Sequence, residues 1–173
     1  MRKHQMVEVK ERKTGPRGAS SPAFLLAQVG GHASAMFAER LSTLDLTPSQ
    51  AGILRAIDAS EGLSQQALCH VLRVVPSRLV ALVDDLEGRG LVERRDNPED
   101  RRIYALYLTD KGREALKTIG RLAREHQDAL CAALTGEERD QLAALLRRIA
   151  DQQGLTPGVH PGFSRIGRKP TSD

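Results

Sequence analysis

The chain has 173 residues, a net charge of +4, and 40% hydrophobic but only 3% aromatic residues. This length suits one domain with tails, and a core with few aromatic residues must be built from Leu, Ala, Val and Ile, which favours helices over a sandwich of sheets. No apolar run approaches the ~20 residues of a membrane-spanning helix and the polar start of the chain has no signal-peptide segment, so we expect a cytoplasmic protein.

Both ends of the chain are predicted to be disordered tails. Residues 1–21 and 153–173 are rich in Gly, Pro, Ser and charged residues, a composition that does not support a packed core. Residues 1–19 alone hold six Lys or Arg against two acids. Basic tails fit contact with a polyanion such as DNA, but many basic tails only keep a protein soluble.

The apolar periodicity predicts helices between the tails. The first spans about residues 22–43, where apolar side chains recur at helical spacing. A second helix begins at Pro48, because Thr47 can cap it, proline fits a first helical position and Gln50 completes a capping box. Its inward face is expected to hold Ile53, Leu54 and Ile57.

A short third helix and a fourth helix flank a tight break. Ser64 caps the third helix. The break falls at Val74–Pro76, and the fourth helix runs over about residues 76–89, where glycines mark its end. Two short helices joined by a tight turn indicate a helix-turn-helix, whose second helix presents its N-terminal side chains to base edges in the DNA major groove.

A charged hairpin follows the fourth helix. Two strand patterns, Leu91–Arg95 and Arg101–Leu108, flank a polar turn at Asp96–Asp100. A hairpin tipped with arginines can reach the DNA backbone or minor groove beside a recognition helix. Because acids nearly balance the bases here, a solvated loop with internal ion pairs is the alternative, and the position directly after a helix-turn-helix favours the DNA contact.

Two longer helices complete the pattern. Thr109 caps one that runs to about residue 133, and Thr135 with Glu138 forms a capping box for a last helix that ends near residue 152. The predicted fold is therefore mainly α with a small β-hairpin wing, a winged helix-turn-helix.

The stretch from Leu46 to Gly112 resembles the MarR family of bacterial regulators. The similarity is densest in three segments: Leu86–Arg95, Asp96–Arg102 with its Asp-x-Arg element, and Leu106–Gly112. The order of the helices extends the resemblance over about residues 22–152 and leaves both tails outside it.

The resemblance implies how the chain assembles and what it binds. Residues 47–108 would form the DNA-binding lobe, and the helices at 22–43 and 109–152 would join two copies in a homodimer. Members of the family bind pseudo-palindromic operators in double-stranded DNA, usually to repress neighbouring genes, and many respond to small, often aromatic, anions. A winged-helix adaptor for protein contacts, without sequence-specific DNA binding, is the alternative function.

The resemblance and the element order together assign residues to the DNA contact. Arg102 is the arginine of the Asp-x-Arg element and is expected to enter the minor groove, with Asp100 orienting its side chain. Arg94, Arg95 and Arg101 are better placed for phosphates. The full predicted set is Ser64, Gln65, Pro76, Ser77, Arg78, Arg94, Arg95, Asp100, Arg101 and Arg102.

The fourth helix departs from the family pattern at its DNA-facing positions. Val80 and Ala81 stand where the family often has polar residues, and an acid, Asp85, replaces a basic residue. That acid and its neighbour would repel phosphates, so Ser77 and Arg78 are expected to carry most of the readout by this helix.

Other candidate sites have weaker support. His32, Met36 and Phe37 could line an effector pocket from the first helix, but ordinary packing in a dimer core explains them at least as well. Cys69 and Cys131 lie among apolar residues, so buried small side chains are a simpler interpretation than a redox switch.

No pattern in the chain indicates catalysis. The five histidines are scattered without the spacing of metal ligands. The sequence also has no recognisable nucleophile–base pair, no carboxylates paired across a pocket and no phosphate-binding glycine loop between a strand and a helix. We therefore expect no enzyme activity, no cofactor and no metal site.

Overall fold

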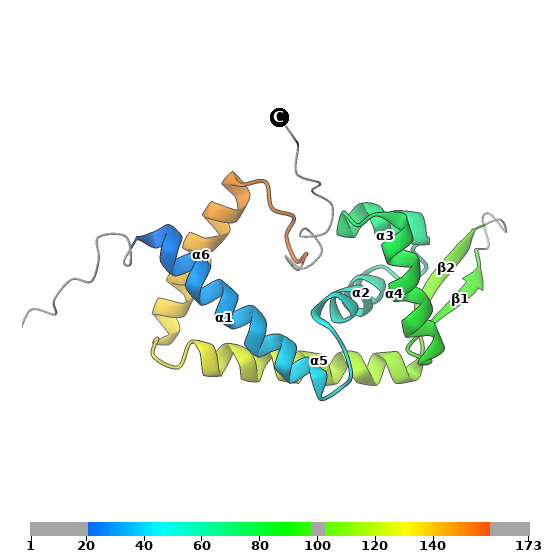
Figure 1. Ribbon diagram of the computed structural model, residues 1–173, viewed down its shortest axis with the longest axis horizontal. Coiled ribbons are helices and arrows are strands. Elements are labelled where there is room, and N and C mark those ends of the chain that lie inside the picture. Colours follow the sequence, from blue (N-terminus) through cyan, green and yellow to red (C-terminus); the bar gives the residue numbers. More distant parts are fainter. Residues whose placement is uncertain (1–20, 98–102, 160–173) are drawn as a thin grey trace, which may run out of the picture. The chain divides into compact units, whose positions relative to one another are not determined.

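The computed structural model describes residues 21–97 and 103–159, which form two compact units that divide between Ala35 and Met36. Its elements are mainly helical, with one two-stranded antiparallel hairpin (Figure 1). They are α1 Pro22–Ser42, α2 Pro48–Ala59, α3 Gln65–Leu72, α4 Pro76–Gly88, β1 Val92–Asp96, β2 Tyr104–Leu108, α5 Asp110–Leu130 and α6 Gly136–Gln152. The predicted fold class, a winged helix-turn-helix, is confirmed.

The predicted caps fix where the helices begin. The hydroxyl groups of Thr47, Ser64, Thr109 and Thr135 each accept a backbone N–H in the first turn that follows them. Both predicted capping boxes are present, since Gln50 and Glu138 also accept the N–H of their cap residues, each at 2.8 Å. Each bond satisfies a donor that a bare helix end would leave without a partner.

The hairpin is held to the rest of the lobe by a backbone ladder. β1 and β2 pair from Val92 opposite Leu108 to Asp96 opposite Tyr104. On its other edge, β2 pairs with the loop between α2 and α3, because the N–H of Leu106 donates to Leu63 at 3.0 Å and its carbonyl accepts from Gly62 at 3.1 Å. The base of the wing therefore cannot shift without breaking these hydrogen bonds to the loop.

The core of the unit formed by residues 36–159 joins the lobe to the end of α1 and to α5. α3 and α4 lie beside the hairpin, and α5 extends from the hairpin past α2 (Figure 1). The side chains with no exposed surface come from the end of α1, from α2 to α4 and from β2: Leu41, Ile53, Leu54, Ile57, Leu68, Leu79, Val83, Leu86, Leu106 and Leu108. Burying such side chains stabilises the fold by about 1.5–3 kcal/mol each.

The backbone turn at Arg89–Leu91, which we call the Leu91 junction, is bound from the start of α5. The hydroxyl of Thr109 donates to the Gly90 carbonyl at 2.7 Å, and Lys111 Nζ donates to the Arg89 carbonyl at 2.8 Å. At Gly112 the helix lies so close that a Cβ atom would come within 2.0 Å of the Leu91 carbonyl oxygen. Only glycine allows this approach.

The bounds of three predicted elements differ in the structure. α5 ends at Leu130 rather than near residue 133, because the Leu134 N–H bonds back to the Cys131 carbonyl in a turn that leads into the extended cap of α6. β1 is shifted by one residue from the predicted Leu91–Arg95, and β2 begins at Tyr104 rather than at Arg101. Residues 98–102 of the hairpin lie outside the described residues.

Many apolar side chains remain exposed on the outer helices. α6 contains no buried residue, and its Leu142, Leu145, Leu146 and Ile149 are exposed. In α1, Phe24, Leu25, Leu26 and Val29 are exposed as well. Among the described residues no single helix is long and apolar enough to cross a membrane, and α3 with α4 meets those criteria only as a bent pair.

Candidate nucleic-acid interface

The turn between α3 and α4 sets the direction of α4. Arg73 takes the left-handed conformation (φ 52°), and Val74 donates its N–H to the Cys69 carbonyl at 3.1 Å while its side chain enters the core. Pro76 then begins α4 at a position where a backbone N–H would have no partner within the helix. The two helices bend by 114° across this break, as in helix-turn-helix units.

The outward face of α4 begins with residues that are not part of the buried core. Leu79, Val83 and Leu86 point into the core, so the positions between them point away. In the first half of the helix the exposed residues are Pro76, Ser77, Val80 and Ala81. Val80 keeps 37% of its surface exposed.

Arg78 differs from the other arginines near this face. Its side chain is half-buried, and among residues 21–97 and 103–159 its Nε has no hydrogen-bond partner and its guanidinium forms no ion pair. A guanidinium offers five donors, and a buried donor without a partner costs free energy. The buried Nε has no acceptor, and the terminal Nη groups have none among the described residues, so this guanidinium is a cation without a partner in the described fold.

The second half of the outward face is bound to the rest of the lobe. Asp85 accepts a hydrogen bond from the amide of Gln50 at 2.6 Å, and Arg89 Nη1 lies 3.7 Å from the same carboxylate. Gln50 is only 7% exposed, so this bond satisfies a buried amide. The acid expected to repel phosphates instead connects α4 to α2.

Arg94, at the base of the wing, holds the neighbouring acids. Its guanidinium pairs with Glu87 and, at 2.5 Å, with Asp84, and it donates to the Gln65 side chain at 3.2 Å. Partial burial lowers the pKa of Arg94, but the hydrogen bonds and charges of both carboxylates outweigh it and raise this pKa above its usual value. The side chain predicted to contact phosphate thus has three internal partners and is 17% exposed.

The predicted contacts at the start of α3 also have internal roles. Ser64 uses its hydroxyl to accept the Ala67 N–H at 3.1 Å, and its backbone forms a bridge to Ala105 of β2. The Gln65 side chain accepts from Arg94. Both residues are half-buried, and both are bonded to residues of the hairpin, Ala105 and Arg94.

On the wing, Arg95 is more open than Arg94. It pairs with Glu93 on the same strand, and its guanidinium carbon lies 4.5 Å from the centre of the Tyr107 ring. Stacking on an aromatic ring holds a cation without removing it from solvent. The predicted residues Asp100, Arg101 and Arg102 lie outside the described residues.

A cavity of about 370 Å³ lies between α2 and α5. Of the three predicted effector residues, Phe37 lines it, whereas His32 and Met36 do not. The cation of this cavity is Arg55, which was not predicted as a site residue and which donates to the Gly158 carbonyl after α6. Helical spacing puts Ala51, Arg55 and Asp58 on one face of α2, and this was the available signal. The remaining lining residues are Pro48, Gly52, Leu116, Ile119, Gly120 and Ala123.

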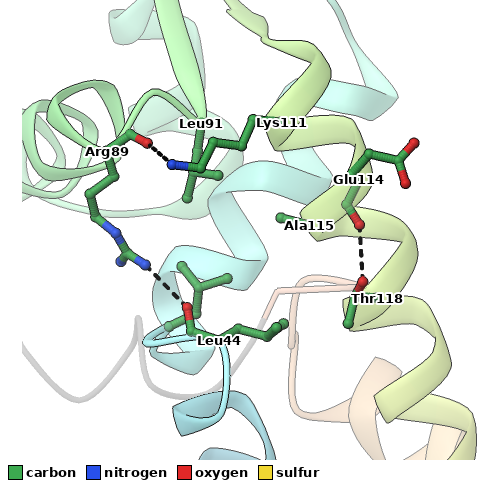
Figure 2. Close-up of a pocket in the computed structure, with 8 residues that line it drawn as sticks. Leu44, Arg89, Leu91, Lys111, Glu114, Ala115 and Thr118 are labelled. Carbon is green, nitrogen blue, oxygen red and sulfur yellow. Dashed lines mark hydrogen bonds between the residues drawn. The ribbon is translucent and has the colours of Figure 1, made fainter.

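Figure 2 shows a second cavity, of about 300 Å³, beside the Leu91 junction. Its two cations, Arg89 and Lys111, are used within the fold, since Arg89 donates to the Leu44 carbonyl at 3.1 Å and Lys111 to the Arg89 carbonyl. Leu46, Leu91, Glu114, Ala115 and Thr118 complete the lining. Both cations of this cavity are therefore bonded to backbone carbonyls of the described fold, which makes it a weaker candidate for an anion site.

Neither cysteine forms a disulfide. Cys69 is buried against the turn, and burial raises the pKa of its thiol, while Cys131 is half-buried. A thiol with a raised pKa is a poor nucleophile near neutral pH. Within residues 21–97 and 103–159 no three His, Cys, Asp or Glu side chains are grouped to hold a metal ion.

The chain is similar to known regulators over most of its length. Residues 44–103 match the MarR family. A protein of Thauera aromatica, described as a transcriptional regulatory protein for the hcr operon, is 37% identical over 122 residues, which are 70% of this chain and 74% of that protein.

Two solved structures with DNA are also similar. The transcriptional repressor CouR bound to a 23-mer DNA duplex is 32% identical, with a TM-score of 0.69 over 84% of this chain and 99% of CouR. A mutant MarR from E. coli, complexed with operator DNA, is 29% identical, with a TM-score of 0.65 over 73% of this chain and 91% of that one. These likenesses extend well beyond the segment in which the motifs are densest.

Proposed function

The chain belongs to the MarR family of transcriptional regulators, and from this premise we propose that it is a sequence-specific DNA-binding regulator that represses neighbouring genes. The observation that carries the proposal is the first half of α4, where Ser77 is exposed and the donors of Arg78 have no partner among the described residues. A protein that binds chromosomal DNA works in the cytoplasm of a bacterium, so the proposal includes that location.

Under this proposal each residue group has a distinct role. Pro76, Ser77 and Arg78 enter the major groove, and Arg95 contacts phosphate from the wing. For Arg94 we propose a positioning role, because it already binds Asp84 and Glu87. The other predicted contacts keep the roles that the family resemblance gives them: Ser64, Gln65, Asp100, Arg101 and Arg102.

The proposed binding unit is a homodimer. The lobe of residues 47–108 shares its core with the end of α1 and with α5, whereas four apolar side chains of α6 and four of α1 stay exposed in a single chain. A two-fold dimer through residues 22–43 and 109–152 would cover such surfaces and would present two recognition helices about 34 Å apart, one turn of DNA. Sedimentation of the full chain should give twice the 18.9 kDa of one copy, and a monomer at micromolar concentration would contradict the dimer.

The cavity between α2 and α5 is the proposed effector site. Its lining is largely apolar and includes Phe37, the cation Arg55 and the carboxylate Asp58. The apolar surface and the guanidinium suit a small aromatic carboxylate. Benzoate, the simplest such anion, should raise the melting temperature of the wild type and weaken its DNA binding. Arg55→Met should remove both effects, and equal responses of the two proteins would exclude Arg55 as the anchor.

The decisive experiment for the function is a binding measurement on DNA. Full-length protein should retain a discrete sequence from a pool of random duplexes, and Arg78→Met should bind that operator about tenfold more weakly, the scale of one good base contact. Lys117→Met is the matched control, because this exposed cation of α5 lies outside α4 and the wing and pairs with Glu114. Sedimentation of both variants checks that each still assembles as the wild type does. Failure to enrich any sequence, with the protein folded, would favour the adaptor function instead.

A further inference from the structure

The second turn of the outward face of α4 carries no polar side chain. One turn after Pro76 and Ser77 come Val80 and Ala81, both exposed. Valine has a lower helix propensity than Ala, Leu, Lys, Arg and Glu, and 37% of the surface of Val80 stays exposed. Packing within the fold therefore accounts for only part of this side chain, and the rest is an apolar surface open to an outside partner.

The surroundings of Val80 determine what can contact it. On the N-terminal side lies Arg78, whose guanidinium has no partner among the described residues. On the C-terminal side lie Asp84 and Asp85, whose carboxylates are held by Arg94 and by Gln50 with Arg89. The acids are thus turned to partners within the lobe, and the surface between them and Arg78 is apolar. A ligand of this surface must present an apolar group next to hydrogen-bond acceptors.

The base edges of DNA contain one such combination. In the major groove thymine presents a C5-methyl group beside its O4 acceptor, and the phosphates supply further acceptors for a guanidinium. We propose that Val80 and Ala81 read the methyl groups of thymine in each half of the operator. This inference rests on the proposed DNA-binding function and names the base that the second turn of α4 recognises.

The test uses thymine and deoxyuridine, which differ only in that methyl group. Affinity is measured for the operator selected from random duplexes, with each thymine replaced in turn by deoxyuridine. Loss of one buried methyl group should weaken binding about fourfold at one thymine, or two adjacent ones, in each half-site. Replacement in both half-sites should multiply the losses to about 16-fold, and the other thymines should be indifferent.

Substitution of the protein assigns the effect to the helix. Val80→Ala should weaken binding to the thymine operator by a similar factor and should no longer distinguish deoxyuridine at that position. Val71→Ala is the matched control, because this valine is 46% exposed on α3 and is not part of the α4 face. It should keep the full deoxyuridine effect.

The outcomes separate this inference from the proposed function. If an operator is selected but every thymine can be replaced without loss, or if Val80→Ala keeps the full deoxyuridine effect, the methyl readout is wrong while DNA binding stands. If no operator can be selected, the proposed function fails and this inference fails with it.

Discussion

The two halves of α4 use their outward faces differently. In the first half, Ser77, Arg78 and Val80 make no side-chain hydrogen bond or ion pair within residues 21–97 and 103–159. In the second half, Asp84 and Asp85 are bound by Arg94 and by Gln50. One helix thus combines a surface left for an external partner with a surface fixed to the fold. Substitutions in the first half of α4 should therefore weaken DNA binding, and substitutions in the second half should lower the stability of the fold.

Asp85 should show the largest effect, on stability alone. Asp85→Ala removes the acceptor of the buried Gln50 amide and should lower the free energy of unfolding by about 2 kcal/mol, the cost of a buried group left without its charged partner. Asp85→Asn keeps an acceptor and should lose about half as much. Urea denaturation at a fixed protein concentration measures both values. A substantial loss of operator affinity in folded Asp85→Asn would break the proposed separation.

Arg78 should show the opposite behaviour. Arg78→Met keeps the apolar part of the side chain and should weaken operator binding by about 1.4 kcal/mol, a factor of ten. Its free energy of unfolding should change by less than about 0.5 kcal/mol, because the charge has no partner in the described fold. Fluorescence anisotropy with labelled operator and urea denaturation test the two halves of this prediction. A loss of more than about 1 kcal/mol in the free energy of unfolding, the average effect of a point mutation, would mean that Arg78 stabilises the fold.

Substitutions of Arg94 and Arg95 should differ in how the DNA affinity of each variant depends on salt. Arg94→Met should lower the free energy of unfolding by about 1 kcal/mol, since two partly exposed ion pairs are lost. The slope of log K against log salt should stay unchanged for DNA binding. Arg95→Met should instead reduce that slope by about 0.9 for each bound copy, as expected for a lost phosphate contact. Equal slopes for the two variants would remove the distinction between them.

Asp84 should show the smallest effect. Its carboxylate is exposed, and its charge is balanced by Arg94 at 2.5 Å. Asp84→Asn should change the free energy of unfolding by less than about 0.5 kcal/mol, as is usual for an exposed ion pair. Operator affinity should change less than twofold. A gain of fivefold or more in an anisotropy titration would show that this acid repels phosphate, as the sequence alone suggested.

Local features of the sequence predicted the elements well. A cap such as Thr47 or Thr135 acts on residues two or three positions away, so its effect can be read from spacing alone. The capping boxes, the tight turn before Pro76 and the hairpin were predicted for this reason, and the structure contains each of them.

The partners of charged residues could not be predicted in the same way. Arg94 meets Asp84 because the end of α4 and the start of β1 lie side by side, and Asp85 meets Gln50 across 35 positions of the chain. Sequence alone gives these acids a charge but not a direction, and so it assigned them to the DNA surface. Arg55 was missed because its role depends on a cavity between helices far apart in the chain.

The glycine at the Leu91 junction has a mechanical consequence. With Gly112 against the Leu91 carbonyl, and with Thr109 and Lys111 bonded to the two preceding carbonyls, the first turn of α5 has no room to slide or pivot against the end of α4. The first turn of α5 is therefore fixed to the segment that joins α4 to β1, and the two would move together. A displacement of the middle of α5, which lines the α2–α5 cavity, would then be transmitted to the end of α4 and the start of β1. In the proposed dimer it would change the distance between the two recognition helices.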